Sequence, residues 1–142
     1  MAQGFVLSLV VLFSTSCNRF PEGPVDLGVS VKWASANVGA AAPYEVGGYY
    51  SWGMTETREN FGFSGYPHTS GSWRDMIKYC LNDYYGQVDG KSVLEPCDDA
   101  ATAALGEDWR TPTEAEWNEL IAGCDWKWKK VHGVKGYVVS NR

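Results

Sequence analysis

The sequence predicts a mixed α+β fold, and three observations lead to this prediction. Residues 98–124 contain two helix starts and a helical spacing of apolar residues. Residues 25–33 and 126–129 instead alternate apolar and polar side chains, which is typical of half-buried strands. The 16 glycines and six prolines indicate short elements joined by many loops, and the length of 142 residues fits one domain.

The first 17 residues are predicted to be a lipoprotein signal peptide. Residues 5–13 form an apolar run that is too short to span a bilayer but has the size of a signal-peptide core. Small residues lead up to Cys17, and Ser-Thr-Ser-Cys resembles a lipobox, which implies that Cys17 is acylated and becomes the mature N-terminus. The alternative is a cleaved secretory signal in which Cys17 is an ordinary first cysteine. Residues 18–24 then form a polar linker.

The domain itself is expected to span residues 25–142 and to begin with strands. Residues 25–33 form either one half-buried strand or two short strands that meet at residues 28–30. A Gly/Ala-rich loop separates this stretch from a second short strand at residues 49–52, whose aromatic side chains suit a pleated surface.

Residues 54–71 show no periodicity and are expected to form a long loop. Loops of this length are uncommon unless they bind something or are mobile. Three aromatic residues of this loop and a nearby tryptophan have no periodic reason to be buried, which makes them the candidate ligand-binding residues: Phe61, Phe63, Tyr66 and Trp73. The other aromatic residues lie mostly at strand or helix positions, where a role in the core is expected.

Local signals predict the remaining elements. Asp89-Gly90 favours a hairpin between residues 84–88 and 92–94. Asp98 or Asp99 can cap an alanine-rich helix that ends at Gly106. Thr113 and Glu116 form a capping box that starts a second helix.

The second helix and the segment after it have clear periodicities. The apolar face of the helix is expected to consist of Trp117, Leu120, Ile121 and Cys124. Beyond the helix, residues 126–129 alternate, His132-Gly133 suits a turn, and residues 136–140 return. This pattern predicts a β-hairpin.

Several segments together resemble the Fibrobacter succinogenes major paralogous domain, a family of lipoproteins from gut bacteria. These segments are VDLGVSVKWASANVGA (25–40), YYSWG (49–53), KYC (78–80), LEPCDDAA (94–101), WRTPTEAEW (109–117) and the WKW…GVKGYVV tail. WRTPTEAEW is also similar to a segment of the formylglycine-generating (sulfatase-modifying) family, whose fold is C-type-lectin-like. The resemblance covers nearly all of residues 25–142. It implies a C-type-lectin-like α+β fold in a Bacteroidetes-type cell-envelope protein.

The two families continue beyond the point that corresponds to Arg142 with further Gly-, Ser- and Trp-rich strands. The resemblance therefore implies that the domain is incomplete at its C-terminus and that the sequence is a fragment. In the formylglycine-generating enzymes the catalytic cysteines lie in that later part. No catalytic residue is carried over to this chain.

The cysteines leave the disulfide pattern open. If Cys17 is lipidated, an odd number remains, so at most one intrachain disulfide forms. Export makes such a bridge plausible, and the favoured pair is Cys80 with Cys124, which leaves Cys97 unpaired. The alternative is three thiols.

The acidic residues and the histidines are the candidate metal ligands of the sequence. Glu95, Asp98 and Asp99 offer oxygen ligands for Ca²⁺, but helix capping explains the two aspartates without a metal. With only two histidines, His68 and His132, and no metal-ligand motif, a zinc site is not expected either. We therefore expect no cofactor and no metal.

Paired carboxylates can act as acid and base, and Glu116 and Glu119 lie one helical turn apart. The capping box already uses Glu116, and acidic residues near a helix start favour its dipole. No catalytic residue is predicted from this pair.

The formal charge of −5 excludes a nucleic-acid binder, since such proteins carry a basic patch. The lysines at 127, 129 and 130 fit the solvent-facing side of a strand. Contact with the outer membrane is expected through the lipid anchor only, on its periplasmic or outer side. The expected function is a non-catalytic binding or adhesion module for a glycan or an envelope protein. The alternatives are an enzyme similar to the formylglycine-generating family and a structural component of the envelope.

Overall fold

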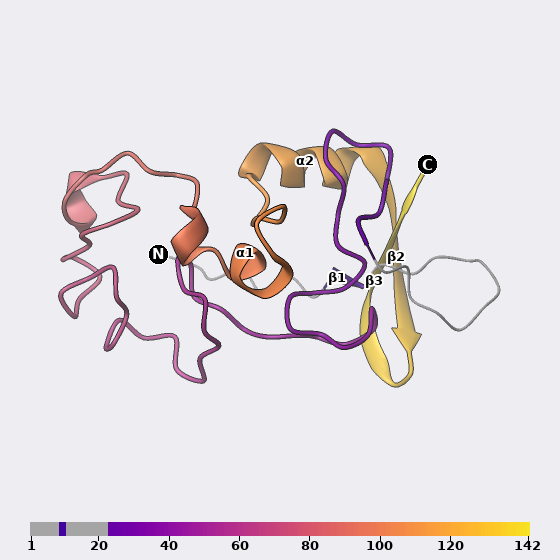
Figure 1. The fold of residues 1–142 in the computed structure, drawn as a ribbon, viewed down its shortest axis with the longest axis horizontal. Coiled ribbons are helices and arrows are strands. Elements are labelled where there is room, and N and C mark those ends of the chain that lie inside the picture. The colour runs from indigo at the N-terminus through magenta and orange to yellow at the C-terminus, as the bar shows by residue number, and fades with distance from the viewer. Residues whose placement is uncertain (1–8, 11–22) are drawn as a thin grey trace. The chain divides into compact units, whose positions relative to one another are not determined.

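The computed structural model describes residues 9–10 and 23–142 of the chain (Figure 1). Cys17 and most of the predicted leader and linker lie outside the described residues. The described residues belong to two compact units, one formed by residues 49–111 and the other by residues 9–10, 23–48 and 112–142. No helix in the described part of the chain is long and apolar enough to cross a membrane.

The second unit contains the longest elements of the described chain. Helix α2 (Glu114–Gly123) runs directly into strand β2 (Cys124–Val131), which pairs antiparallel with β3 (Val134–Asn141) along its whole length. In Figure 1 this hairpin is yellow and continues from the orange α2. The two turn residues, His132 and Gly133, have φ angles of 47° and 87°, as expected for a two-residue hairpin turn. The predicted hairpin is confirmed.

Strand β1 (Leu9–Val10) pairs parallel with the other edge of β3, at Tyr137 and Val138. The sequence assigned these two residues to a leader outside the fold, whereas the structure has them at the edge of the sheet. A sheet edge offers backbone N–H and C=O groups to any extended apolar segment, which accounts for the pairing.

A single buried cluster forms the core of the second unit: Val25, Leu27, Trp33, Leu120, Cys124 and Val139. Residues 25–33 do not form a long strand. They bend back so that Val25 and Trp33 exchange two backbone hydrogen bonds, of 2.7 and 2.9 Å. This arrangement is closer to the prediction of two short segments that meet near residue 28.

The predicted apolar face of α2 is wrong at one position. Leu120 is fully buried and Trp117 is half-buried, with its ring 4.9 Å from that of Trp33, but Ile121 is 55% exposed. One residue step turns an α-helix by about 100°, so a residue next to Leu120 can point away from the core when only one side of the helix is covered.

Side-chain hydrogen bonds fix α2 at its start and along its side. The capping box is confirmed, since the Glu116 carboxylate accepts the backbone N–H of Thr113 at 2.8 Å and the Thr113 hydroxyl accepts that of Glu116 at 3.3 Å. Glu119 does not pair with Glu116. Its carboxylate accepts the backbone N–H of Ser30 at 2.8 Å and also the Ser30 hydroxyl, which fastens the loop of residues 25–33 to the helix.

The first unit consists mainly of loops, with two 3₁₀ turns, η1 (Asp83–Tyr85) and η2 (Pro96–Asp98), and helix α1 (Ala100–Leu105). Asp99 caps α1 and Gly106 ends it, as predicted. The Asp99 carboxylate also accepts the backbone N–H of Thr111 at 2.7 Å, which ties the segment after α1 to the helix start.

One predicted strand and one predicted hairpin of the first unit are corrected. Residues 49–52 contribute only one bridge, between Tyr50 and Thr57. The hairpin at Asp89-Gly90 does not form, because the Asp89 carboxylate accepts the backbone N–H groups of Tyr79 and Cys80, each at 2.9 Å. These bonds hold Asp89 against a segment ten residues earlier in the chain.

Candidate functional site

Met76 is the backbone position around which three segments of the first unit meet. It forms one bridge with Thr69 and another with Gly86. The Met76 N–H donates to Tyr85 O at 2.9 Å, and the Met76 carbonyl accepts the Gln87 N–H at 2.8 Å. The turn before Met76 and η1 are thereby held side by side.

The side chains carried by these segments form an exposed aromatic cluster, which we define as Trp73, Arg74, Tyr84 and Tyr85. The ring centroids lie 5.7 Å apart for Trp73 and Tyr84, 6.0 Å for Trp73 and Tyr85, and 5.2 Å for Tyr84 and Tyr85. Trp73 is 40%, Tyr84 56% and Tyr85 37% exposed. The rings therefore pack on one another at the surface instead of entering a core.

The residues on either side of Tyr84 and Tyr85 explain why the short helix η1 forms at this point of the chain. The Asn82 side chain accepts the backbone N–H of Tyr84 at 2.9 Å and so caps η1. After η1 the chain turns through Gly86, which has a φ of 145°. Such a backbone conformation favours glycine.

Arg74 is the charged member of the aromatic cluster. Its guanidinium lies 4.4 Å from the Trp73 ring centroid and 5.1 Å from that of Tyr84, and it donates to the Tyr84 hydroxyl at 2.8 Å. Cation–π contacts of this kind restrict the long side chain to one place. Among the described residues, no carboxylate forms an ion pair with Arg74.

The four predicted ligand-binding residues are not brought together. Trp73 belongs to the aromatic cluster, whereas no ring contact joins it to Phe61, Phe63 or Tyr66 among the described rings. Tyr66 is half-buried and donates to the Trp52 carbonyl at 2.6 Å, and burial raises the pKa of Tyr66 to about 12. Phe61 stays exposed, so its role as a binding residue remains a prediction.

Sequence reasoning missed Arg74, Tyr84 and Tyr85. The adjacent tyrosines were visible in the sequence, but they lay inside the segment that was predicted to be a hairpin. The signal that could have found them is the neighbouring Asn82, a capping residue, together with Gly86.

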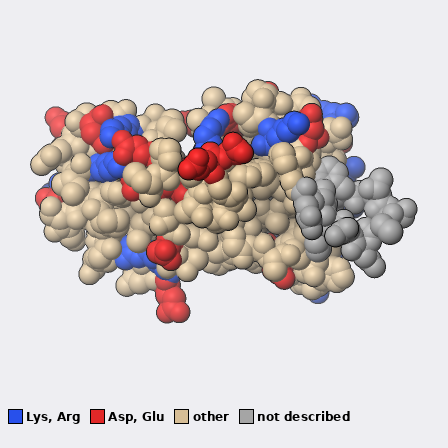
Figure 2. Space-filling view, in the orientation of Figure 1, with Lys and Arg blue, Asp and Glu red and all other residues tan. Residues whose placement is uncertain are grey.

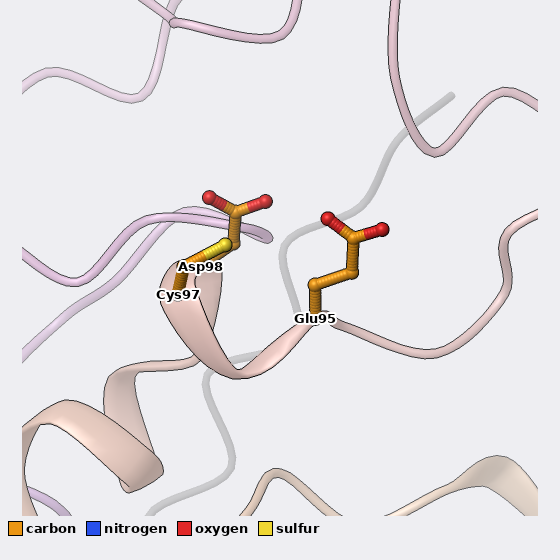
Figure 3. A group of neighbouring side chains, drawn as sticks. All are labelled: Glu95, Cys97 and Asp98. Atoms are coloured by element: carbon orange, nitrogen blue, oxygen red, sulfur yellow. The ribbon is translucent and has the colours of Figure 1, made fainter.

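A second constellation lies around η2, where Glu95, Cys97 and Asp98 each offer a metal-ligand atom and these atoms lie within 4.8 Å of one another. Figure 3 shows both carboxyl groups on the same side of the turn, with the Cys97 sulfur beside Asp98. The Lys78 ammonium lies 2.5 Å from an oxygen of Glu95 and 2.5 Å from one of Asp98. A cation of the protein itself thus already occupies the space between the two carboxylates.

The Asp98 oxygen that faces Lys78 also accepts the Tyr79 hydroxyl at 2.7 Å. Burial alone would raise the pKa of Asp98, but the hydrogen bonds from Lys78 and Tyr79 outweigh it and leave the pKa below its ordinary value. The hydrogen bonds to Asp98 and Glu95 raise the pKa of Lys78. Both groups are therefore held in their charged forms, which suits an ion pair and does not suit proton transfer.

Asp99, the third carboxylate that the sequence offered as a Ca²⁺ ligand, caps α1, as the helix-capping interpretation predicts. It is almost fully buried and accepts the backbone N–H groups at the helix start. The structure brings only Glu95 and Asp98 together.

His68 is the buried histidine of the first unit. Its Nε2 lies 2.7 Å from the Gly53 carbonyl oxygen, and its ring meets those of Tyr66 and Tyr79 edge-on at 5.4 and 5.1 Å. A Cβ on Gly53 would stand 2.8 Å from the His68 ring, so glycine is needed there for the close approach. These contacts give His68 a packing role.

Cys80, Cys97 and Cys124 are all free in the structure. The buried Cys80 thiol lies 3.1 Å from the Asn82 carbonyl oxygen, and the buried Cys124 thiol lies 3.8 Å from that of Leu27. Burial raises the pKa of Cys124. Cys80 and Cys124 belong to different units, and the disulfide between them stays a prediction.

Charges on the molecular surface are mixed. On the face drawn in Figure 2, Lys and Arg side chains occur next to Asp and Glu side chains, and most of the remaining surface carries neither. The lysines at 127, 129 and 130 are exposed, as predicted for the solvent side of a strand.

Comparisons with known proteins add no relative to this picture. No protein-family model matches the chain, and neither a curated protein nor a solved structure matches it. The chain's function must therefore be argued from its own residues.

Proposed function

We propose that the chain is a non-catalytic binding module of the bacterial cell envelope and that the aromatic cluster contacts its ligand, a saccharide. One observation carries the proposal: Trp73, Tyr84 and Tyr85 pack against one another while each stays more than one-third exposed. Exposed aromatic groups that are held in place, and do not contribute to a core, mark interaction sites.

The chemistry of the aromatic cluster suits a sugar. The ring faces can cover the apolar C–H face of a pyranose, while the two tyrosine hydroxyls and the guanidinium supply polar partners for its hydroxyl groups. Backbone bonds at Met76 hold the cluster before any ligand arrives, so little conformational entropy is lost on binding.

The cellular setting of the proposal comes from the sequence motifs. The apolar run before Cys17 supports export, and the lipobox supports a lipid anchor in the outer membrane. The segments at residues 25–40, 94–101 and 109–117 support membership of the major paralogous domain family and a C-type-lectin-like architecture. A mixed content of helices and strands is compatible with that architecture.

The test is direct binding of saccharides to the full chain, purified in detergent and applied to an array of plant and microbial oligosaccharides. Trp73→Ala should abolish binding of every saccharide that the unchanged chain retains. Trp128→Ala is the matched control, since it removes another exposed tryptophan, whose ring contacts Tyr137 and not the aromatic cluster. A chain that binds no saccharide, or a Trp73→Ala variant that binds like the unchanged chain, would overturn the proposal and favour a structural role.

A further inference from the structure

The charge of Arg74 points to a narrower class of ligand at the aromatic cluster. We propose that the saccharide carries a carboxylate, as a uronic acid does, and that the Arg74 guanidinium binds this carboxylate while the rings cover the sugar. The inference rests on the proposed function, because it names the ligand class of the same site.

The aromatic cluster holds Arg74 with most of its hydrogen-bond donors unused. A guanidinium has five N–H donors, and among the described residues only the Tyr84 hydroxyl takes one of them. The contacts with the Trp73 and Tyr84 rings hold the guanidinium beside the rings without using its other donors. A fixed planar fork with free N–H groups matches the two oxygens of a carboxylate.

Some cations of the described residues are neutralised by carboxylates, whereas Arg74 is not. Lys78 pairs with Glu95 and Asp98, and Lys91 pairs with Glu95. Arg74 has no such partner among the described residues, and neither have Arg58 or the lysines at 127, 129 and 130. Arg74 differs from these other unpaired cations in that its guanidinium lies against the rings of Trp73 and Tyr84. The aromatic cluster thus presents a positive charge that an external anion can neutralise.

The acidic residues nearest in sequence set a limit to this attraction. Asp75 follows Arg74 directly and Asp83 precedes Tyr84, and both are exposed. Their charges oppose an anionic ligand through solvent, so the preference for acidic sugars should be moderate and should depend on salt. Asp83→Asn should accordingly strengthen the binding of an acidic saccharide and leave a neutral one unaffected.

The experiment compares matched ligands by calorimetry with the full chain: uronic-acid oligosaccharides and the methyl esters of the same oligosaccharides. The esters keep the sugar rings and lose the charge. We expect the acids to bind about tenfold more tightly at low salt, which is the effect of one charge-assisted hydrogen-bonded pair. Arg74→Gln should lower the affinity for the acids to that for the esters, and Arg74→Lys should retain part of the preference.

Arg58→Gln is the control, because Arg58 belongs to the same unit but contacts Met54 and Ser64 and not the aromatic cluster. Near-ultraviolet circular dichroism of the tryptophans checks that Arg74→Gln leaves the ring packing intact. Equal affinity for acids and esters, combined with loss of both in Trp73→Ala, would overturn the acidic-ligand inference and leave the proposed function standing. Absence of binding to both ligands would overturn the acidic-ligand inference, and absence of binding to every saccharide of the array would overturn the proposed function as well.

Discussion

Gly86 lies so close to Met76 that a Cβ atom on Gly86 would stand 2.2 Å from the Met76 carbonyl oxygen and 2.4 Å from its backbone nitrogen. Backbone atoms cannot yield as a flexible side chain can. The position of η1 beside the turn at Trp73 therefore depends on the absence of a side chain at Gly86. The contact between Trp73, Tyr84 and Tyr85 depends on that position.

Gly86→Ala should destabilise the first unit and disperse the aromatic cluster. The backbone conformation alone should cost about 1–3 kcal/mol for a residue with a side chain, and the clash with Met76 adds to this. Urea unfolding followed by tryptophan fluorescence measures the loss. Gly90→Ala is the control, since Gly90 also has a positive φ, of 69°, but no heavy atom lies within 4 Å of its Cβ position. Equal losses in the two variants would contradict the role of close approach.

Stability should fall in acid because of Asp98. Its folded-state pKa lies below its ordinary value, so the folded chain binds fewer protons than the unfolded chain, and protonation favours unfolding. The contribution is present above the ordinary pKa of about 4 and is lost as the pH falls through the lower folded value. Asp98→Asn should be less stable than the unchanged chain at pH 7 and should lose less further stability on acidification.

Thermal unfolding from pH 7 to pH 2.5 would show this difference in slope. Asp75→Asn serves as the control, because Asp75 takes part in none of the ion pairs of the described residues. Parallel pH profiles for Asp98→Asn and the unchanged chain would rule out the proposed linkage.

Lys78→Gln should turn the η2 constellation into a weak Ca²⁺ site. Removal of the ammonium leaves the carboxylates of Glu95 and Asp98 facing each other, and Ca²⁺ prefers such oxygen ligands. Millimolar CaCl₂ should then raise the Tm of the variant more than that of the unchanged chain. Lys91→Gln releases an oxygen of Glu95 only and should show no such gain. A Ca²⁺ response as large in the unchanged chain would mean that Lys78 does not block the site.

Asp99→Ala should cost more stability than an ordinary cap. Its carboxylate accepts the N–H groups of Ala101 and Thr102 at the start of α1, and the N–H and hydroxyl of Thr111. We expect a loss of at least about 2 kcal/mol, since buried donors are left without partners. Thr113→Ala, which removes the cap of α2, should cost about 1 kcal/mol. Chemical denaturation of both variants decides whether the additional bonds of Asp99 matter.

Cys17→Ala should abolish acylation. When the chain is expressed in a bacterial host with a fatty-acid probe, the unchanged chain should carry the label and partition into membranes. The variant should carry no label and appear in the soluble fraction. A label that persists in Cys17→Ala would show that the lipobox prediction is wrong.

Elements that depend on neighbouring residues were predictable from the sequence. Asp99 and Gly106 delimit α1, Thr113 and Glu116 begin α2, and the turn at His132 closes the hairpin; each signal lies within a few residues of the element it sets. The prediction of a hairpin at Asp89-Gly90 was wrong because the Asp89 carboxylate accepts the N–H groups of residues 79 and 80, which are distant in sequence.

The same distinction applies to the candidate site. Trp73 was predicted because its own surroundings lack periodicity, but its partners Tyr84 and Tyr85 reach it only through the bridge between Met76 and Gly86. The residues next to the two tyrosines do not indicate their contact with Trp73. The prediction that Ile121 is buried was wrong for a related reason. Helical spacing shows which residues lie on the apolar face of a helix, but tertiary contacts decide how much of that face is covered.

Backbone hydrogen bonds at Met76, and not the burial of their own side chains, hold the aromatic residues in place. The segments that carry positions 73, 74, 84 and 85 should consequently fold in the same way when the side chains at these positions are changed. Substitutions at these four positions should therefore change the chemistry of this surface and leave the backbone bonds at Met76 in place.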